Sequence, residues 1–180
     1  MSATVIINRL TGVYSAPTYH NVTSTNVRVN ADDVNSTNST SDPIAIPFSG
    51  DAYSFWFCLQ LEVTVNATSD TINNLKFFSS GSDTVGTGCT LVGNGATTYI
   101  QATGVVGTSG DQLTTAAYTT LYATPVDYST FSVGSSLALA GTTSTVAKVG
   151  DFVVLQYVVD STASPGSTVQ QLLYFQFDES

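Results

Sequence analysis

The side chains that could act as a catalytic base or a metal ligand are few in this sequence. His20 is the only histidine, and it lies in a polar stretch with no nucleophile motif around it. Because a Ser-His-Asp or Cys-His arrangement uses histidine as its base, such chemistry would depend on this one residue. Zinc needs three or four Cys, His or carboxylate ligands, and Cys58, Cys89 and His20 have no ligand spacing. The sequence therefore predicts a protein that is not an enzyme and binds no structural zinc.

Carboxylates are more numerous, but their positions favour turns over catalysis. A glycosidase needs two carboxylates across a cleft, whereas Glu62 stands beside Gln60 in an alternating segment and fits a polar strand face. Asp83, Asp151 and Asp160 adjoin Gly or Ser, as turn-forming aspartates do. Calcium is the one cofactor left open, since loop aspartates and backbone carbonyls form oxygen cages. The candidate calcium ligands are Asp32, Asp33, Asp42, Asp51 and Asp127.

Aromatic side chains offer a different kind of site. Trp56, with Tyr53 and Phe55 close in sequence, has the ring size of a platform that stacks on sugars. The alternation of the segment places Trp56 opposite Phe55 and Phe57, which favours packing against a second sheet instead. If the chain assembles with other chains, large aromatic residues on its strands are candidate contacts. The candidate interface residues are Trp56, Tyr157 and Tyr174.

Basic residues are scarce. Arg9, Arg28, Lys76 and Lys148 stand against thirteen acids, which gives a formal net charge of −9. A protein that binds the phosphate backbone needs several cations on one face, so the sequence excludes nucleic acid as a direct ligand. Only 9% of the residues are charged, against about a quarter in typical soluble proteins. Ser, Thr and Asn supply the other polar groups, and these residue types favour strands and turns over helices.

The sequence carries no pattern of an export signal or a membrane span. Residues 1–9 lack a basic region followed by an apolar stretch of signal-peptide length. No later run approaches the roughly 20 apolar residues that cross a bilayer. We therefore expect a protein that is made and folded in a cytoplasm, has no membrane partner, and keeps Cys58 and Cys89 reduced.

Alternation with a period of two residues is the clearest structural signal. It predicts a long, half-buried antiparallel strand at the centre of the core over residues 55–65. One face carries Phe55, Phe57, Leu59, Leu61, Val63 and Val65. The other carries Trp56, Cys58, Gln60, Glu62 and Thr64. Further strands are predicted at residues 71–78, 89–92, 99–103, 131–133, 137–140, 152–160 and 169–178.

Glycine, proline and small polar residues predict the turns between these strands. Gly93-Asn94-Gly95 predicts the turn of a hairpin. Gly150-Asp151 predicts a turn, residues 161–167 predict a hairpin-type turn before the last strand, and residues 79–83 predict another. In the interval 104–127 the pattern does not distinguish a strand from a short helix.

A length of 180 residues predicts a single domain. Short strands separated by turns about every ten residues are typical of an antiparallel β-sandwich or a jelly-roll-like fold, so the predicted fold class is all-β. Residues 44–180 form the predicted sandwich core. Residues 1–43 are predicted to form an N-terminal arm or edge strands with a polar loop, and they could reach onto a neighbouring chain.

Two parts of the sequence resemble a known class of proteins. Residues 148–157, with 163–166 and 175–179 after them, resemble the closing hairpin of small β-sandwich virion proteins from tailed phages and related prokaryotic viruses. Residues 55–61, leading to 72–77, resemble a strand pair of the same proteins. The resemblance implies a structural component of a virus particle, which decorates the head or belongs to the neck or tail, commonly as a homo-oligomer. It implies no functional residue.

The function that we expect is non-enzymatic. Apolar residues on both faces of the strand at 152–160 and a hydroxyl-rich exterior indicate a protein that works through its contacts. We expect a structural protein of the virion, a capsid decoration or a head or tail component, assembled in the host cytoplasm with copies of itself and other virion proteins. One alternative is a carbohydrate- or surface-binding module, which predicts an exposed row of aromatic residues and a monomer. Another is a surface-layer or pilus subunit, which requires export.

Overall fold

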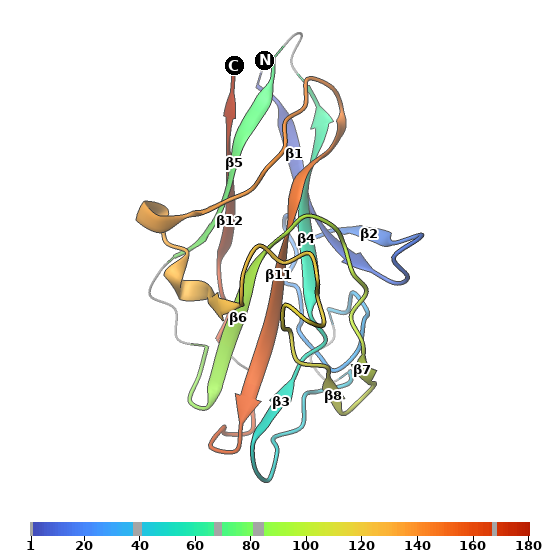
Figure 1. Ribbon diagram of the computed structural model, residues 1–180, viewed down its shortest axis with the longest axis vertical. Helices are drawn as coiled ribbons and strands as arrows, with labels where there is room; N and C mark the ends of the chain where they lie inside the picture. Colours follow the sequence, from blue (N-terminus) through green and yellow to red (C-terminus); the bar gives the residue numbers. More distant parts are fainter. Residues whose placement is uncertain (1, 38–40, 67–69, 81–84, 167–168) are drawn as a thin grey trace.

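A computed structural model describes residues 2–37, 41–66, 70–80, 85–166 and 169–180. The fold is all-β, and its described strand pairs are antiparallel. Two sheets enclose a common core (Figure 1), which confirms the predicted antiparallel sandwich, whereas the strand order does not confirm jelly-roll connectivity. Within the described residues, no helix is long and apolar enough to cross a membrane.

The larger sheet holds seven strands and the smaller sheet three. The order in the larger sheet is β2 (Thr18–Asn21), β1 (Thr4–Thr11), β4 (Phe57–Val65), β11 (Ala147–Asp160), β6 (Cys89–Ala96) and β9 (Val126–Asp127), and β3 (Asp51–Tyr53) also pairs with β11. The order in the smaller sheet is β10 (Leu137–Ala138), β5 (Ile72–Ser79) and β12 (Leu173–Glu179). The other elements are the pair β7 (Gly104–Val105) and β8 (Ser109–Gly110) and the 3₁₀ turns η1 (Tyr128–Thr130) and η2 (Val133–Ser135).

The predicted strand at 55–65 begins only at Phe57, and Phe55 belongs to the core on the other side of the larger sheet, not to the face of Phe57. The β4 strand is central, as its alternation predicted. It lies between β1 and β11, and Leu59, Leu61 and Val63 belong to the core between the sheets. The smaller sheet contributes aromatic rings to this core, with the centroids of Phe77 and Phe175 5.5 Å apart in an edge-on arrangement. Because alternate residues of a strand face opposite ways, the residues between these positions point to the other side of the larger sheet.

That other side has a core of its own. Trp56 and Cys58 pack there against Tyr118, in the segment 97–121 that covers the sheet. The rings of Trp56 and Tyr118 are 5.8 Å apart, and the indole nitrogen of Trp56 donates to the carbonyl oxygen of Ile100 at 3.1 Å. The prediction that Trp56 packs against the second sheet is therefore wrong, because the covering segment buries this face instead.

Gly93-Asn94-Gly95 lies inside a continuous strand, so the predicted turn and hairpin are wrong. The β6 strand runs through these residues, pairs with β11, and places Gly93 opposite Leu155. A Cβ atom on Gly93 would lie 2.4 Å from the carbonyl oxygen of Val154, and one on Gly95 would lie 2.5 Å from the ring of Tyr122. Glycine is needed because its neighbours approach closely, not because the chain turns.

The predicted turn at Gly150-Asp151 is a bulge within β11. The register between β11 and β4 shifts between Val149 and Val153. Gly150 has a φ of +79°, which glycine adopts without steric cost and which suits a bulge. The strand therefore continues past the glycine and reaches 14 residues, pairing with β4, β6 and β3.

The segments that follow β4 and β11 change sheets. Because β11 lies in the larger sheet and β12 in the smaller one, the hairpin-type turn predicted at 161–167 is wrong, although residue 167 itself lies outside the described residues. The strands at 55–61 and 72–77 lie in different sheets for the same reason and are not a bonded pair. The last strand begins at Leu173, later than predicted. Of the turn predicted at 79–83, residues 81–83 lie outside the described residues.

Strands from the N-terminal segment join the larger sheet of their own chain. The β1 strand pairs with β4, and β2 forms the edge beyond it. After β2, the backbone nitrogen of Val22 donates to the carbonyl oxygen of Ile7 at 2.8 Å, and residues 22–31 continue without strand structure. The domain boundary at residue 43 stays a prediction.

Candidate functional site

The smaller sheet ends at β12, whose outer edge carries no further strand in the described part of the chain. Leu173, Phe175 and Phe177 pack against the core from this strand, but all three are only partly buried. Val5 and Ile7 of β1, on the larger sheet, are partly buried as well. The core is therefore incompletely covered at this edge, because three strands do not cover a sheet of seven.

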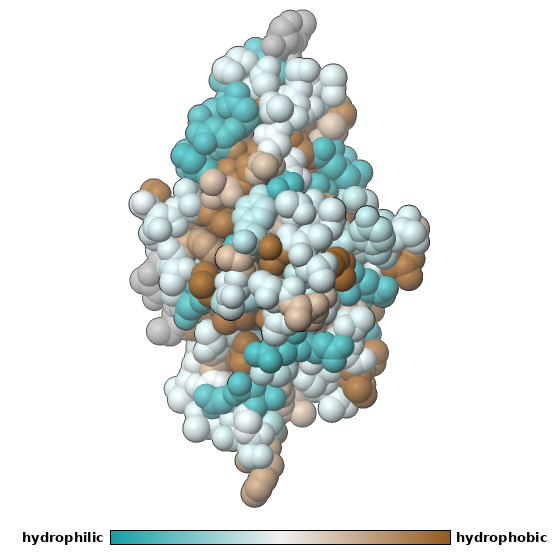
Figure 2. Space-filling view, in the orientation of Figure 1, coloured by the Kyte–Doolittle hydropathy of each residue, from teal (hydrophilic) through white to brown (hydrophobic). Residues whose placement is uncertain are grey.

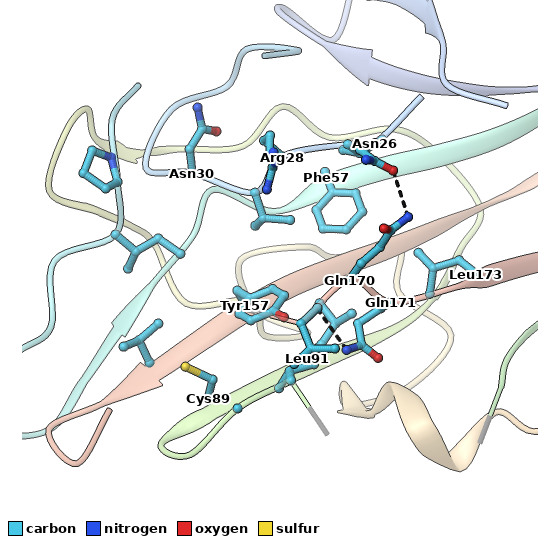
Figure 3. A pocket seen from close by; sticks show the side chains of 18 of the residues that line it. Asn26, Arg28, Asn30, Phe57, Cys89, Leu91, Tyr157, Gln170, Gln171 and Leu173 are labelled. Atoms are coloured by element: carbon cyan, nitrogen blue, oxygen red, sulfur yellow. Dashed lines mark hydrogen bonds between the residues drawn. The ribbon is translucent and has the colours of Figure 1, made fainter. Parts of the chain in front are cut away.

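A cavity of about 980 Å³ lies next to the start of β12. Strands of the larger sheet supply its apolar side: Phe57 comes from β4, Leu91 from β6 and Tyr157 from β11 (Figure 3). The remaining walls come from Ile7 and Val159 and from residues in the segments 22–30, 41–46, 85–89, 163–166 and 169–173. Phe57, Leu91 and Tyr157 are far apart in the sequence but line the same cavity because β4, β11 and β6 are adjacent in the sheet.

One hydrogen bond joins two of these walls. The side-chain nitrogen of Gln170 donates to the side-chain oxygen of Asn26 at 2.8 Å (Figure 3). Gln171 is the next residue, and its side chain donates to the carbonyl oxygen of Val169 at 3.0 Å. Amide side chains therefore link the segment before β12 to the segment after β2.

Arg28 is the only charged residue among the described residues that line the cavity. Its side chain is half-buried, and its Nε atom has no hydrogen-bond partner among the described residues. Figure 3 shows Arg28 between Asn30 and Phe57 on one wall. The chain has thirteen acids, yet none of them is among the described lining residues, so the cavity carries positive charge in an acidic protein.

Asn30 is a second polar residue of this wall. It is 3% exposed, and both Nδ2 and Oδ1 lack a hydrogen-bond partner in the part of the chain that the structure describes. Its carbonyl oxygen is satisfied, since it accepts from the backbone nitrogen of Phe55 at 3.0 Å. Burying an amide without hydrogen-bond partners costs about 1–3 kcal/mol of stability, so the burial of the Asn30 side chain needs an explanation.

A second arginine lies next to Arg28. Arg9 is 1% exposed, and its Nη1 atom donates to the carbonyl oxygen of Arg28 at 3.0 Å. The guanidinium carbon of Arg9 lies 5.7 Å from the centre of the Phe57 ring. Burial lowers the pKa of Arg9, and the negative charge of Asp33 opposes this effect. Two of the four basic residues of the chain therefore occupy this region.

The predicted interface residues occupy different environments. Trp56 is 2% exposed and Tyr157 is 6% exposed, so neither side chain can contact another chain unless the structure opens. Tyr157 lines the cavity instead. Tyr174 is 40% exposed and stacks on Phe78 of β5, with ring centroids 5.2 Å apart. Of the three residues, Tyr174 alone is available at the surface.

His20 and Glu62 connect strands of the larger sheet. The Nε2 atom of His20 lies 2.9 Å from the hydroxyl oxygen of Thr11, and burial together with the charge of Arg9 lowers the pKa of His20. Glu62 accepts a hydrogen bond from the side-chain amide of Asn8 at 2.5 Å. These contacts join β1 to β2 and to β4.

Three of the five aspartates considered as calcium ligands, Asp32, Asp33 and Asp127, accept hydrogen bonds from the backbone. Asp33 accepts from the nitrogen of Gly12 at 2.8 Å, and Asp127 accepts from the nitrogen of Ser129 at 2.9 Å at the start of η1. Among the described residues, no three His, Cys, Asp or Glu side chains form a group that could hold a metal ion. Calcium binding stays a prediction.

The aspartates predicted to form turns are partly confirmed. Asp160 accepts from the backbone nitrogen of Thr162 at 2.6 Å, as a turn-forming aspartate does. Asp151 lies at the bulge and accepts from the hydroxyl of Tyr122 at 2.5 Å. Asp83 lies outside the described residues.

Cys58 and Cys89 are free thiols, as predicted. Burial raises the pKa of Cys58 to about 12. Cys89 lines the cavity, and burial raises its pKa as well. Because the thiolate is the nucleophilic form, these environments do not activate either cysteine at neutral pH.

Exposed apolar side chains are spread over the surface. On the face shown in Figure 2, the apolar areas are small and separated by pale, weakly polar ones. Around the start of β12, however, Val169 is 62%, Leu172 53% and Tyr174 40% exposed. The exposed apolar side chains thus lie on β12 and on the residues just before it, where the core is also incompletely covered.

Sequence reasoning missed Arg28 and Asn30 as site residues. The available signal was a basic residue between two valines, Val27 and Val29, in an otherwise polar stretch. An arginine can bury its aliphatic stem against apolar neighbours while its charged head stays near water.

The chain was compared with family models, with curated proteins and with solved structures, and none of them matches it.

Proposed function

We propose that this protein is a non-enzymatic structural subunit of a virus particle, which assembles through contacts with copies of itself and with other virion proteins. The observation that carries the proposal is the free edge of β12 among the described strands, where Leu173, Phe175 and Phe177 are incompletely covered. An edge strand presents unpaired backbone groups that can pair with another chain. In a subunit, a neighbouring chain covers this edge.

The sequence supports the viral part of the proposal. Residues 148–157 and 175–179 resemble segments of phage virion proteins. The subunit would belong to the virion as a head decoration protein or a head or tail component, after assembly in the host cytoplasm. The carbohydrate-binding alternative has less support, because Trp56, its first candidate for a stacking ring, is buried.

Light scattering of the purified protein over a concentration series, at low and moderate salt, tests the proposal. We expect a closed oligomer whose mass is constant over the series. A monomer at every concentration, which also fails to bind its particle, would overturn the proposal.

Paired variants locate the interface. Tyr174→Lys together with Gln176→Lys places two cations on the exposed side of β12, and charged side chains on an edge strand oppose pairing. We expect this variant to dissociate at protein concentrations at which the wild type is assembled. Val133→Lys is the matched control, because Val133 is 73% exposed and belongs to η2. Equal dissociation of both variants would exclude the β12 edge as the contact.

A further inference from the structure

We propose that the cavity next to β12 binds a small amphipathic acid, a molecule with one carboxylate at the end of an apolar group. This proposal does not depend on the proposed function. A volume of about 980 Å³ lies at the upper end of the roughly 300–1,000 Å³ that ligand pockets have. Such pockets combine apolar walls with a few polar groups that orient the ligand.

The apolar part of the ligand would lie against side chains of the sandwich core. Phe57, Leu91 and Tyr157 line the cavity from three adjacent strands, and Leu173 and Phe175 line it from β12. Leu173 and Phe175 pack against the core but are only partly buried. An apolar group in the cavity would cover them and remove more apolar surface from water.

The charged part of the ligand follows from Arg28. A guanidinium group matches a carboxylate in geometry as well as in charge, and Arg28 is the only charged residue among the described lining residues. Its Nε atom has no partner in the described parts of the chain, and the buried cation of Arg9 lies next to it. Asn30 on the same wall is an amide with no described partner, but its Nδ2 atom is buried and does not open into the cavity. The carboxylate would therefore accept from the guanidinium group of Arg28.

The hydrogen bond between Gln170 and Asn26 favours a small molecule over a protein segment. At 2.8 Å this bond joins two walls of the cavity. An extended chain that passed between these walls would have to break the bond, whereas a short ligand that ends inside the cavity leaves it intact. A cation in place of the carboxylate would meet Arg28 with like charge.

Titration calorimetry with dodecanoate below its micelle concentration tests the proposal at pH 7.5. We expect one molecule per chain, and binding of the dodecyltrimethylammonium cation that is weaker by about tenfold or more. Dodecanol, which has a similar tail without a charge, should bind with intermediate affinity. Equal affinity for the anion and the cation would overturn the proposal, as would several equivalent sites per chain.

Two variants test separately which residues contact the carboxylate and which contact the apolar group of the ligand. Arg28→Met should weaken dodecanoate binding by about tenfold or more and leave dodecanol binding unchanged. Lys76→Met is the matched control, because Lys76 lies on β5 and is not among the lining residues. Leu173→Trp should fill the cavity and weaken binding of both ligands. Melting curves establish that each variant is folded, and unchanged dodecanoate binding by folded Arg28→Met would exclude the site.

Discussion

The sulfur atom of Cys58 lies 3.3 Å from the hydroxyl oxygen of Tyr118, inside the core on the outer side of the larger sheet. The same hydroxyl donates to the carbonyl oxygen of Thr98 at 2.9 Å and accepts from the backbone nitrogen of Ile100 at 2.8 Å. A single buried oxygen thus connects β4 to the segment that covers it.

Replacing Tyr118 with phenylalanine should destabilise the protein. Tyr118→Phe leaves the backbone nitrogen of Ile100 without this partner, whereas the carbonyl oxygen of Thr98 still accepts from the hydroxyl of Thr120 at 3.2 Å. Because one buried unpaired group costs about 1–3 kcal/mol, we expect urea unfolding to show a loss of about 1–3 kcal/mol in the free energy of unfolding. Tyr174→Phe is the control, since the 40% exposed Tyr174 lies on the outer side of β12 and should tolerate the change.

Stability should fall at alkaline pH, in part because of Cys58. Burial raises the pKa of its thiol from 9.0 to about 12 in the folded protein. Above pH 9 the unfolded chain therefore releases this proton while the folded chain retains it, so the stabilisation present below pH 9 is progressively lost as pH rises towards 12. Between pH 7 and pH 10 we expect the wild type to lose about 1 kcal/mol more than Cys58→Ala in urea unfolding. Equal losses in the two proteins would contradict the raised pKa.

A methyl group at Gly93 should disrupt the centre of the larger sheet. The Cβ atom of Gly93→Ala would lie 2.4 Å from the carbonyl oxygen of Val154, and the sheet backbone has little freedom to move away. We expect a loss of about 3 kcal/mol or more, measured by thermal or urea unfolding. Gly134→Ala is the control, because no described atom outside its chain neighbours lies within 4 Å of the place that its new methyl group would take. Unchanged stability of Gly93→Ala would contradict the close approach of Val154.

Gln156 should be intolerant of apolar replacement. Its side chain is fully buried; its nitrogen donates to the carbonyl oxygens of Ser54 and Asp111, at 2.8 Å and 2.7 Å, and its oxygen accepts from the nitrogen of Leu113 at 2.7 Å. Gln156→Leu leaves these three backbone groups unpaired, which should cost about 3–5 kcal/mol and increase amide exchange at Leu113. Gln176→Leu, on the exposed side of β12, should change stability little.

The sequence predicted strands correctly where one residue pattern persists over many residues, but residues 99–103 and 131–133, predicted as short strands, form none. Alternation in residues 55–65 identified β4, because a strand that buries its two faces in different surroundings repeats its residue types every second position. Glycines were harder to interpret. In the sequence, Gly93 and Gly150 do not differ from a glycine in a turn. The structure distinguishes them: the carbonyl of Val154 lies close to Gly93, and Gly150 lies where the register of β11 shifts at a bulge.

The candidate site could not be predicted in the same way. Its walls come from strands and segments that are far apart in sequence, and no local pattern states that Arg28 and Tyr157 line one cavity. Trp56 shows the same limit: its burial followed from alternation, but the partner that buries it, Tyr118, lies in a segment whose pattern did not specify a structure.

The central position of β11 also determines when the sheet can form during synthesis. The β4 strand ends at Val65 and β11 begins at Ala147, so the ribosome must add all the intervening residues before these two strands can pair. Until then, the apolar face of β4 lacks the cover that β11 and the rest of the core provide, and exposed apolar surface is the condition in which nascent chains aggregate. Chains truncated before Ala147 should therefore require a chaperone to remain soluble, whatever the stability of the finished protein.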